Sequence, residues 1–276
     1  MEIISSVSAL RERLGKEASV ALVPTMGNLH AGHLDLVRIA QQHAQCVVVS
    51  IFVNPLQFGA NEDFGTYPRT LQDDCDKLKA CGVAVVFAPT EADMYPQPQQ
   101  VTVEPPAIAQ ELCGAFRPEH FRGVATVVLK FFYIVQPQVA VFGKKDYQQL
   151  HVVRQMVAQL NVPVTIVGAE TLRASDGLAL SSRNQYLSQV ERTESTFMYL
   201  MLMEIQLALK NGVHNYTQLE QTAVKELVSH SWQVDYVAIR SQATLLVPAP
   251  GERELVVLAA ARLGKTRLID NVEVCL

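Results

Sequence analysis

Short runs of apolar residues alternate with longer helical patterns over the first 170 or so residues. Five runs are continuous, strand-sized and rich in β-branched residues, beginning at Val20, Cys46, Val83, Gln138 and Val162. Continuous apolar strands are typical of parallel sheets that are buried on both faces. The intervening segments, such as 33–45 and 67–82, are long enough for crossover helices. The pattern predicts an α/β fold with a Rossmann-like, doubly wound parallel sheet.

The pattern changes after about residue 171. Ser188 with Glu191, and Thr217 with Glu220, have the spacing of capping boxes that open helices. Three later runs, "VDYVAIR", "ELVVLAAARLG" and "TRLIDNVEV", predict strands joined by turns. We therefore expect two domains: residues 1–171 form the parallel sheet, and residues 172–276 form a smaller α+β C-terminal domain that acts as a lid.

Composition narrows the class of protein. The chain has 276 residues, 49% hydrophobic and 18% charged, and no apolar run approaches the roughly 18 residues that a membrane helix needs. The five cysteines lack a Cys-x-x-Cys pair, and the net charge of -4 favours neither nucleic acid nor an anionic membrane. The first residues do not resemble a secretion signal. We expect a cytoplasmic protein that binds no nucleic acid and no membrane.

"PTMGNLHAGHLDL" places His30 and His33 where a strand passes into a helix. The carboxyl ends of such strands hold the ligand in doubly wound sheets. Gly27 and Gly32 let the backbone approach a phosphate at the helix N-terminus, where N–H groups favour anions. The two histidines then add donors for charge on an α-phosphate. Metal binding by the pair is the weaker alternative, because no nearby cluster supplies further ligands at a familiar spacing.

Three other segments carry polar side chains after predicted strands or turns. "FVNPLQF" offers the amides of Asn54 and Gln57, and Gln149 joins them if "KKDYQQL" opens a helix. Amides can orient the hydroxyl and carboxylate groups of a small substrate without adding charge. "FGKKD" and "LSSRN" offer Lys145 and Arg183, whose charges can stabilise phosphoryl oxygens. Each motif alone is weak.

Taken together, six motifs are specific: "PTMGNLHAGH", "SIFVNPLQF", "YPRT", "RPEHFRGVATVV", "FGKKDYQQL" and "DGLALSSRNQYL". In this order and at these spacings they closely resemble the pantoate–β-alanine ligase family of the nucleotidyltransferase superfamily, over nearly the whole chain and including "RLIDN". The resemblance implies that ATP and Mg²⁺ serve the condensation of (R)-pantoate with β-alanine. A pantoyl adenylate is the intermediate, and pantothenate, AMP and pyrophosphate are the products. It also implies a homodimer.

Carried over by position, the resemblance implies three nucleotide-binding segments and a pantoate pocket. His30 and His33 lie at the phosphates, with His33 as the proton donor, and Lys145 and Arg183 complete the catalytic set. The implied ATP-binding residues are Met26, Gly27, Asn28, Leu29, His30, Ala31, Gly32, His33, Gly143, Lys144, Lys145, Asp146, Leu172, Leu180, Ser181, Ser182 and Arg183. The implied substrate-binding residues are Asn54, Gln57 and Gln149.

Two acidic residues and two departures from the family pattern leave alternatives open. Asp73 and Asp74 match positions thought to assist the metal-bound nucleotide, but a solvated acidic helix face is equally compatible with the sequence. Lys144 stands where the "FGEKD" form has glutamate. The added positive charge either tightens ATP binding or only replaces a solvent contact. Cys113 replaces the glutamate of the "LEG" flap, so we expect no catalytic role for its side chain.

Two rival functions remain compatible with single motifs. A nucleotidylyltransferase that acts on a phosphomonoester would need extra cationic groups for its acceptor, where this chain offers the amides of Asn54, Gln57 and Gln149. A nucleotide-sensing protein could keep the fold and lose turnover, although the presence of His30 and His33 argues against that loss.

Overall fold

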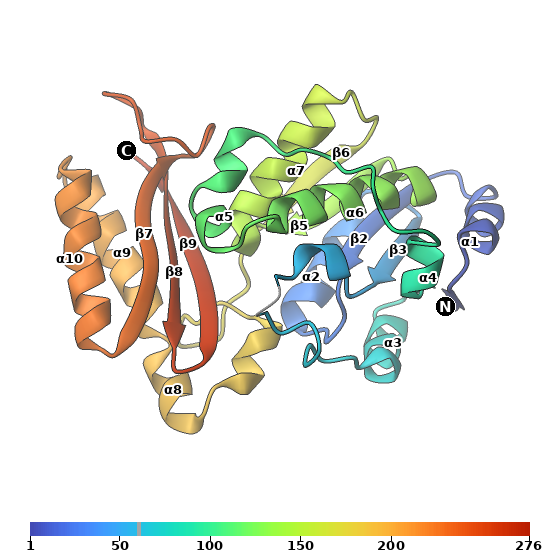
Figure 1. Ribbon diagram of the computed structural model, residues 1–276, viewed down its shortest axis with the longest axis horizontal. Helices are drawn as coiled ribbons and strands as arrows, with labels where there is room; N and C mark the ends of the chain where they lie inside the picture. The colour runs from blue at the N-terminus through green and yellow to red at the C-terminus, as the bar shows by residue number, and fades with distance from the viewer. Residues whose placement is uncertain (60–61) are drawn as a thin grey trace. The chain divides into compact units, whose positions relative to one another are not determined.

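The computed structural model describes residues 1–59 and 62–276 (Figure 1). Its contacts divide the chain into two compact units. The first comprises residues 1–109, 117–144 and 149–170, and the second comprises residues 110–116, 145–148 and 171–276. The second unit therefore includes two short segments that the sequence pattern assigns to the first domain.

The first unit is built on a six-stranded sheet in the order β1-β4-β3-β2-β5-β6, with every neighbouring pair parallel. The strands are β1 (Glu2–Ile4), β2 (Val20–Thr25), β3 (Cys46–Ile51), β4 (Val85–Phe87), β5 (Val139–Gly143) and β6 (Thr165–Ala169). The chain runs outward from β2 to β3 and β4, then returns to the other side of β2 as β5. This is the predicted doubly wound arrangement, which is confirmed.

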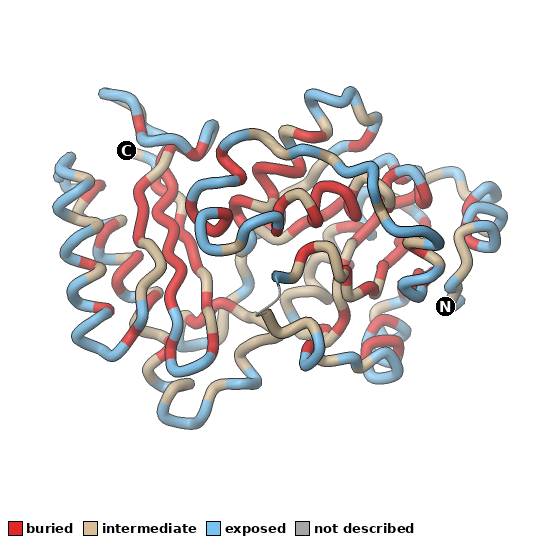
Figure 2. The backbone as a smooth tube through the Cα atoms, in the orientation of Figure 1, coloured by how far each residue is buried: buried red, intermediate tan, exposed pale blue. Residues whose placement is uncertain are grey.

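Successive side chains of a strand point to opposite faces of the sheet, and in these strands both sets are apolar. Helices therefore cover the sheet. They are α1 (Val7–Leu14), α2 (Ala31–Gln41), α3 (Leu71–Ala80), α4 (Glu91–Met94), α6 (His120–Val135) and α7 (Tyr147–Gln159). Val23 and Val49 share a buried cluster with Val37 of α2 and Leu78 of α3. On β4, Phe87 meets Phe131 of α6 edge-on, with ring centroids 6.3 Å apart. Figure 2 shows that β2, β3 and β4 are almost entirely buried, whereas the edge strands β1 and β6 are mostly exposed or intermediate.

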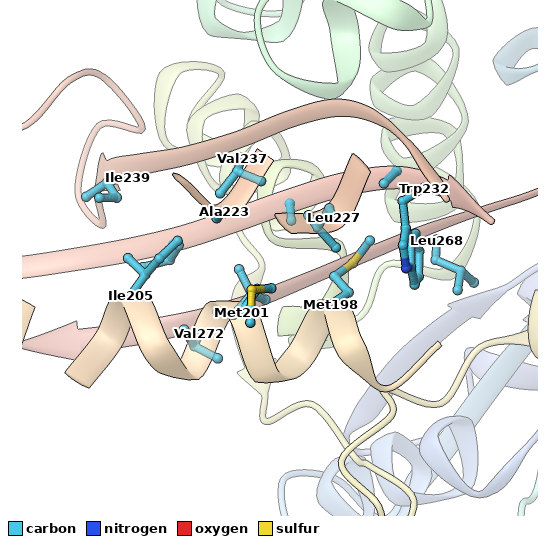
Figure 3. Close-up of a cluster of buried hydrophobic side chains, with 14 of the residues drawn as sticks. Met198, Met201, Ile205, Ala223, Leu227, Trp232, Val237, Ile239, Leu268 and Val272 are labelled. Atoms are coloured by element: carbon cyan, nitrogen blue, oxygen red, sulfur yellow. The ribbon is translucent and has the colours of Figure 1, made fainter. Parts of the chain in front are cut away.

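The second unit has a three-stranded antiparallel sheet packed against helices, which confirms the predicted smaller α+β domain. Its longer elements are α8 (Gln189–Glu194), α9 (Phe197–Lys210), α10 (Tyr216–Ser229), β7 (Trp232–Ser241), β8 (Glu254–Leu263) and β9 (Thr266–Cys275). Figure 3 shows Met201 and Ile205 of α9 in its core with Leu227 of α10 and Val272 of β9. Across the described residues, no helix is both long and apolar enough to cross a membrane.

One of the two predicted capping boxes is confirmed. Ser188 accepts a hydrogen bond from the N–H of Glu191, whose carboxylate accepts the N–H of Ser188 in return. The prediction for Thr217 is wrong, because α10 begins earlier and Asn215 caps it by accepting from the N–H of Gln218. The carboxylate of Glu220 instead accepts the N–H of Ile239 in β7.

The doubly wound order places a switch point between β2 and β5, where ligands of such sheets bind. The loop that leaves β2 there contains two residues with left-handed backbone, Gly27 with φ +83° and Asn28 with φ +50°. A Cβ on Gly27 would approach Asp74 Oδ2 to 3.0 Å and Ile51 Cγ2 to 3.1 Å. The left-handed conformation favours glycine here, and a side chain would also crowd Asp74 and Ile51.

Helix α3 holds this loop in place through two charged side chains. Asp74, which is fully buried, accepts the N–H of Asn28 at 2.9 Å and of Leu29 at 2.7 Å. Its Oδ2 also accepts the hydroxyl of Thr70 at 3.0 Å. Lys77 Nζ donates to the carbonyl of Leu29 at 2.8 Å. The turn that precedes α2 is thus fixed by α3 as well as by its own backbone.

Replacing Asp74 with asparagine tests this clamp. The amide presents an NH₂ group where a carboxylate oxygen now accepts a buried N–H, so the free energy of unfolding should fall by roughly 1–3 kcal/mol. Asp73→Asn is the matched control, because Asp73 is exposed in the same helical turn and shares the helix-dipole contribution. Chemical denaturation of both variants measures the difference, and equal losses would contradict the clamp.

Candidate active site

The two predicted histidines cap helix α2 reciprocally. The N–H of Gly32 donates to His30 Nδ1 at 3.1 Å, and the N–H of His30 donates to His33 Nδ1 at 3.3 Å. The two rings lie with their centroids 4.1 Å apart. Histidine thus occupies both positions that Ser or Thr and Glu occupy in an ordinary capping box.

This capping assigns the tautomer of both rings. A nitrogen that accepts from a backbone N–H carries no proton, so each ring is neutral and bears its proton on Nε2. Each imidazole therefore accepts a backbone N–H at Nδ1 and offers its own N–H at Nε2, farther from the backbone. The donors that the sequence predicted on the two histidine side chains are therefore their Nε2–H groups.

The side-chain amides of Asn54 and Gln57, both predicted site residues, lie together in the first unit. They differ in how many of their hydrogen-bonding groups are engaged within the protein. Asn54 is 1% exposed, and its Oδ1 accepts from the N–H of Leu56 and the hydroxyl of Tyr95. Its Nδ2 donates to Gln57 Oε1 at 3.0 Å and to the carbonyl of Gly123 at 3.2 Å. The amide of Asn54 is thus fully engaged inside the protein, which suits it to hold Gln57 rather than a substrate.

The backbone of Gln57 is also held by the first residue of α6. His120 Nδ1 lies 2.9 Å from the carbonyl of Gln57, and since a carbonyl only accepts, Nδ1 carries the proton. His120 Nε2 then accepts from Arg117 Nη1 at 3.0 Å. Arg117 in turn forms a bidentate ion pair with the carboxylate of Glu62. The motif "RPEHFRGVATVV" was part of the resemblance, but the sequence predicted no role for His120, and this buried contact was missed.

In the second unit, a buried ion pair organises the loop that contains Leu172 and Leu180. Arg173 donates to both oxygens of Asp270, at 2.6 and 2.8 Å, and to the carbonyls of Gly177 and Asn271. Burial raises the pKa of Asp270, and the adjacent Arg173 opposes that rise. The backbone of Leu172 accepts the N–H of Leu180 at 3.0 Å, which closes the loop.

The same loop requires a glycine. Gly177 has φ +94°, and a Cβ there would lie 2.4 Å from Cδ1 of Tyr199. The ring of Tyr199 is occupied on one side by the guanidinium of Arg173, 4.0 Å from its centroid. Arg173 and Asp270 were not predicted as site residues, although "RLIDN" was among the segments that carry the resemblance.

Lys145 and the serine segment lie near this ion pair in the second unit. The carbonyl of Lys145 accepts from Asn271 Nδ2 at 2.9 Å, which fixes the lysine backbone to β9. A small cavity is lined by Lys145, Ser181, Asn184 and Asp270 among others. Ser181 caps the 3-10 helix Ser182–Tyr186 by accepting the N–H of Arg183 at 3.2 Å. The predicted residues Lys145 and Ser181 therefore border one cavity.

The remaining predicted residues lie at the ends of elements. Lys144, at the end of β5, pairs with the exposed Glu170 at 2.5 Å, and Lys145 Nζ lies 3.8 Å from Asp146 Oδ2. Gln149 is half-buried in the first turns of α7. The pair formed by Lys144 favours the interpretation that this departure replaces a solvent contact, because exposed pairs of this kind contribute little.

A metal role for the two aspartates finds no support in their contacts. Asp74 is fully buried, and both of its oxygens accept hydrogen bonds from the α2 loop or from Thr70. Asp73 is exposed on α3. Within residues 1–59 and 62–276, no three His, Cys, Asp or Glu side chains gather to hold a metal ion. The contacts of Asp74 are thus structural, and the metal role of the two aspartates stays a prediction.

Comparison with known proteins agrees with the fold and with these motifs. A model of the family described as pantoate-beta-alanine ligase matches residues 2–273. The pantothenate synthetase of Nitrosospira multiformis is 56% identical over 274 residues, covering 99% of this chain and 98% of that protein. That of Chromobacterium violaceum is 58% identical over 275 residues, covering 99% of both.

Solved structures extend the agreement to three dimensions. The pantothenate synthetase of Thermus thermophilus superposes with a TM-score of 0.95 at 43% identity, covering 100% of both chains. The pantoate-beta-alanine ligase of Francisella tularensis, complexed with beta-gamma ATP and beta-alanine, gives a TM-score of 0.83 at 33% identity and covers 99% of this chain and 97% of that one. The predicted resemblance and enzyme class are confirmed. The chain therefore belongs to the pantoate-beta-alanine ligase family.

Proposed function

We propose that this enzyme uses ATP to join (R)-pantoate to β-alanine through an enzyme-held pantoyl adenylate. The observation that carries the proposal is the reciprocal capping of α2 by His30 and His33, which presents two neutral N–H donors at the switch point of the sheet. The complex of the Francisella tularensis relative with beta-gamma ATP and beta-alanine supports the choice of those two substrates. Pantoate and the adenylate are proposed from family membership and from the amides.

In the first step, a carboxylate oxygen of pantoate attacks the α-phosphorus of ATP and pyrophosphate leaves. The carboxylate is ionised near neutral pH, so the step needs positioning and charge neutralisation rather than a general base. His30 and His33 donate from Nε2 to the phosphoryl oxygens, and Lys145 and Arg183 add positive charge. Gln57 and Gln149 orient pantoate through their amides.

In the second step, the free amine of β-alanine attacks the activated carbonyl of the adenylate. The C–N bond forms, the bond from the carbonyl carbon to the phosphate oxygen breaks, AMP leaves, and the amine loses a proton. Acyl adenylates hydrolyse readily, so the site must exclude water. We retain the C-terminal unit as the proposed lid.

The other proposed contacts follow the family positions. Met26 to His33, Gly143 to Asp146, Leu172 and Leu180 to Arg183 bind ATP, with Mg²⁺ entering bound to the nucleotide phosphates, as it commonly does. A homodimer and a cytoplasmic location stay predictions.

Exchange of labelled pyrophosphate into ATP tests the reaction. Exchange that depends on pantoate and needs no β-alanine is expected, because adenylation alone is reversible. A nucleotidylyltransferase would show exchange with a phosphomonoester instead. ATP binding without any exchange would support the nucleotide sensor and overturn the proposal.

His33→Ala and Lys145→Ala should each lower the exchange rate by on the order of 100-fold or more, as expected when a donor to the developing charge is removed. Lys210→Ala is the matched control for Lys145, since Lys210 is exposed at the end of α9, outside the proposed binding segments, and its loss should change the rate little. Steady-state exchange at saturating substrates measures the loss. A near-normal rate in either variant removes that residue from the mechanism.

Cys113→Ser tests the departure in the "LCG" segment. The thiol is buried in the second unit, 3.1 Å from the hydroxyl of Tyr236, and a serine hydroxyl can keep that hydrogen bond. The burial of Tyr236 and the adjacent thiol raise the pKa of that tyrosine, so its hydroxyl stays protonated at neutral pH. We expect less than about a twofold change in turnover for a conserved neutral hydrogen bond. A large loss would give the Cys113 side chain a direct function.

A further inference from the structure

The orientation of the Asn54 amide is fixed by groups that have only one hydrogen-bonding role. The backbone N–H of Leu56 can only donate, and it meets Oδ1 at 3.3 Å. The carbonyl of Gly123 can only accept, and it lies 3.2 Å from Nδ2. Turning the amide over would place donor against donor and acceptor against acceptor. Asn54 therefore presents its NH₂ group to Gln57.

The orientation of Asn54 determines that of Gln57. Since Asn54 Nδ2 donates to Gln57 Oε1 at 3.0 Å, the acceptor end of the Gln57 amide is occupied. Its donor end, Nε2, lies 3.2 Å from the sulfur of Met26, which is a weak acceptor. Gln57 thus presents N–H groups on the side of the Met26 to His33 loop, and the partner that satisfies them best is a carboxylate or hydroxyl oxygen.

Tyr95, just after α4, completes this chain of hydrogen bonds from the far side. Its hydroxyl donates to Asn54 Oδ1 at 2.7 Å, the shortest contact that Asn54 makes. Burial, with a smaller contribution from Glu91, raises the pKa of Tyr95, so the hydroxyl keeps its proton. The ring is held independently, 6.0 Å from the Phe52 ring and 4.5 Å below the ammonium of Lys130.

We propose that Tyr95 is a positioning residue for the pantoate oxygen that accepts a hydrogen bond from Gln57. It acts through Asn54, whose engaged amide holds Gln57 with its N–H donors toward the substrate. The inference rests on the proposed function, in which Gln57 contacts pantoate. It assigns Asn54 to the same supporting chain, so that of these two neighbouring amides Gln57 makes the direct contact.

Tyr95→Phe tests the inference, because phenylalanine keeps the ring against Phe52 and Lys130 and removes only the hydroxyl. The KM for pantoate should rise about fivefold, the usual effect of losing one neutral hydrogen bond. The KM for ATP and kcat should stay within about twofold. Tyr133→Phe is the matched control, because Tyr133 is 64% exposed on α6, and it should change neither constant.

A double-mutant cycle with Gln57→Ala separates positioning from general structure. If Tyr95 acts through Gln57, the further change caused by Tyr95→Phe should vanish once Gln57 is alanine. An undiminished effect in that background, or equal changes in the KM for ATP and for pantoate, would overturn the inference. Asn54→Ala breaks the same chain at its centre and should raise the KM for pantoate at least as much.

Thermal denaturation of each variant shows whether the protein is still folded. If Tyr95→Phe does not fold, the cycle is run with Asn54→Ala, and an unchanged KM for pantoate in that folded variant overturns the inference. Failure of the proposed function is a separate result, because it would appear as absent pantoate-dependent exchange in the unmodified enzyme.

Discussion

The buried carboxylate of Asp74 is the contact on which the histidine site depends. Its two oxygens bind the N–H groups of Asn28 and Leu29, in a turn where Gly27 and Asn28 both have left-handed backbone. A carboxylate accepts several N–H bonds more strongly than a neutral group does. This clamp acts together with the glycine at position 27 and the reciprocal histidine cap to favour the backbone conformation that starts α2 at His30.

The fixed start of α2 explains why histidines can replace the usual capping residues. An ordinary cap satisfies a helix N–H and ends there. An imidazole accepts that N–H at Nδ1 and offers another at Nε2. His30 and His33 therefore place hydrogen-bond donors one ring farther from the start of the helix than its own N–H groups. The neutral form needed for capping is also the form that donates without adding a full charge. The tautomer that capping requires is therefore one that can also donate to a phosphoryl oxygen.

The sequence predicted the sheet well because strands buried on both faces leave a continuous apolar signal. The capping box at Ser188 was also predictable, because its two partners lie within four residues of each other in the sequence. The prediction failed at Thr217, where Glu220 bonds to Ile239 of a strand that lies 19 residues away. Residues 110–116 and 145–148 group with the second unit through contacts that are distant in the sequence, such as that of Asn271 with Lys145.

The same limit applies within the site. Sequence reasoning grouped Asn54 with Gln57 as equivalent amides, because residue type reveals what a side chain can bond but not what it does bond. The partners that distinguish them, Tyr95 and Gly123, lie 41 and 69 residues from Asn54 along the chain. Four hydrogen bonds leave Asn54 no remaining donor, whereas Gln57 keeps N–H groups that face a thioether. A buried amide with every group engaged fixes orientation, and one facing a weak acceptor is ready to exchange it for a substrate oxygen.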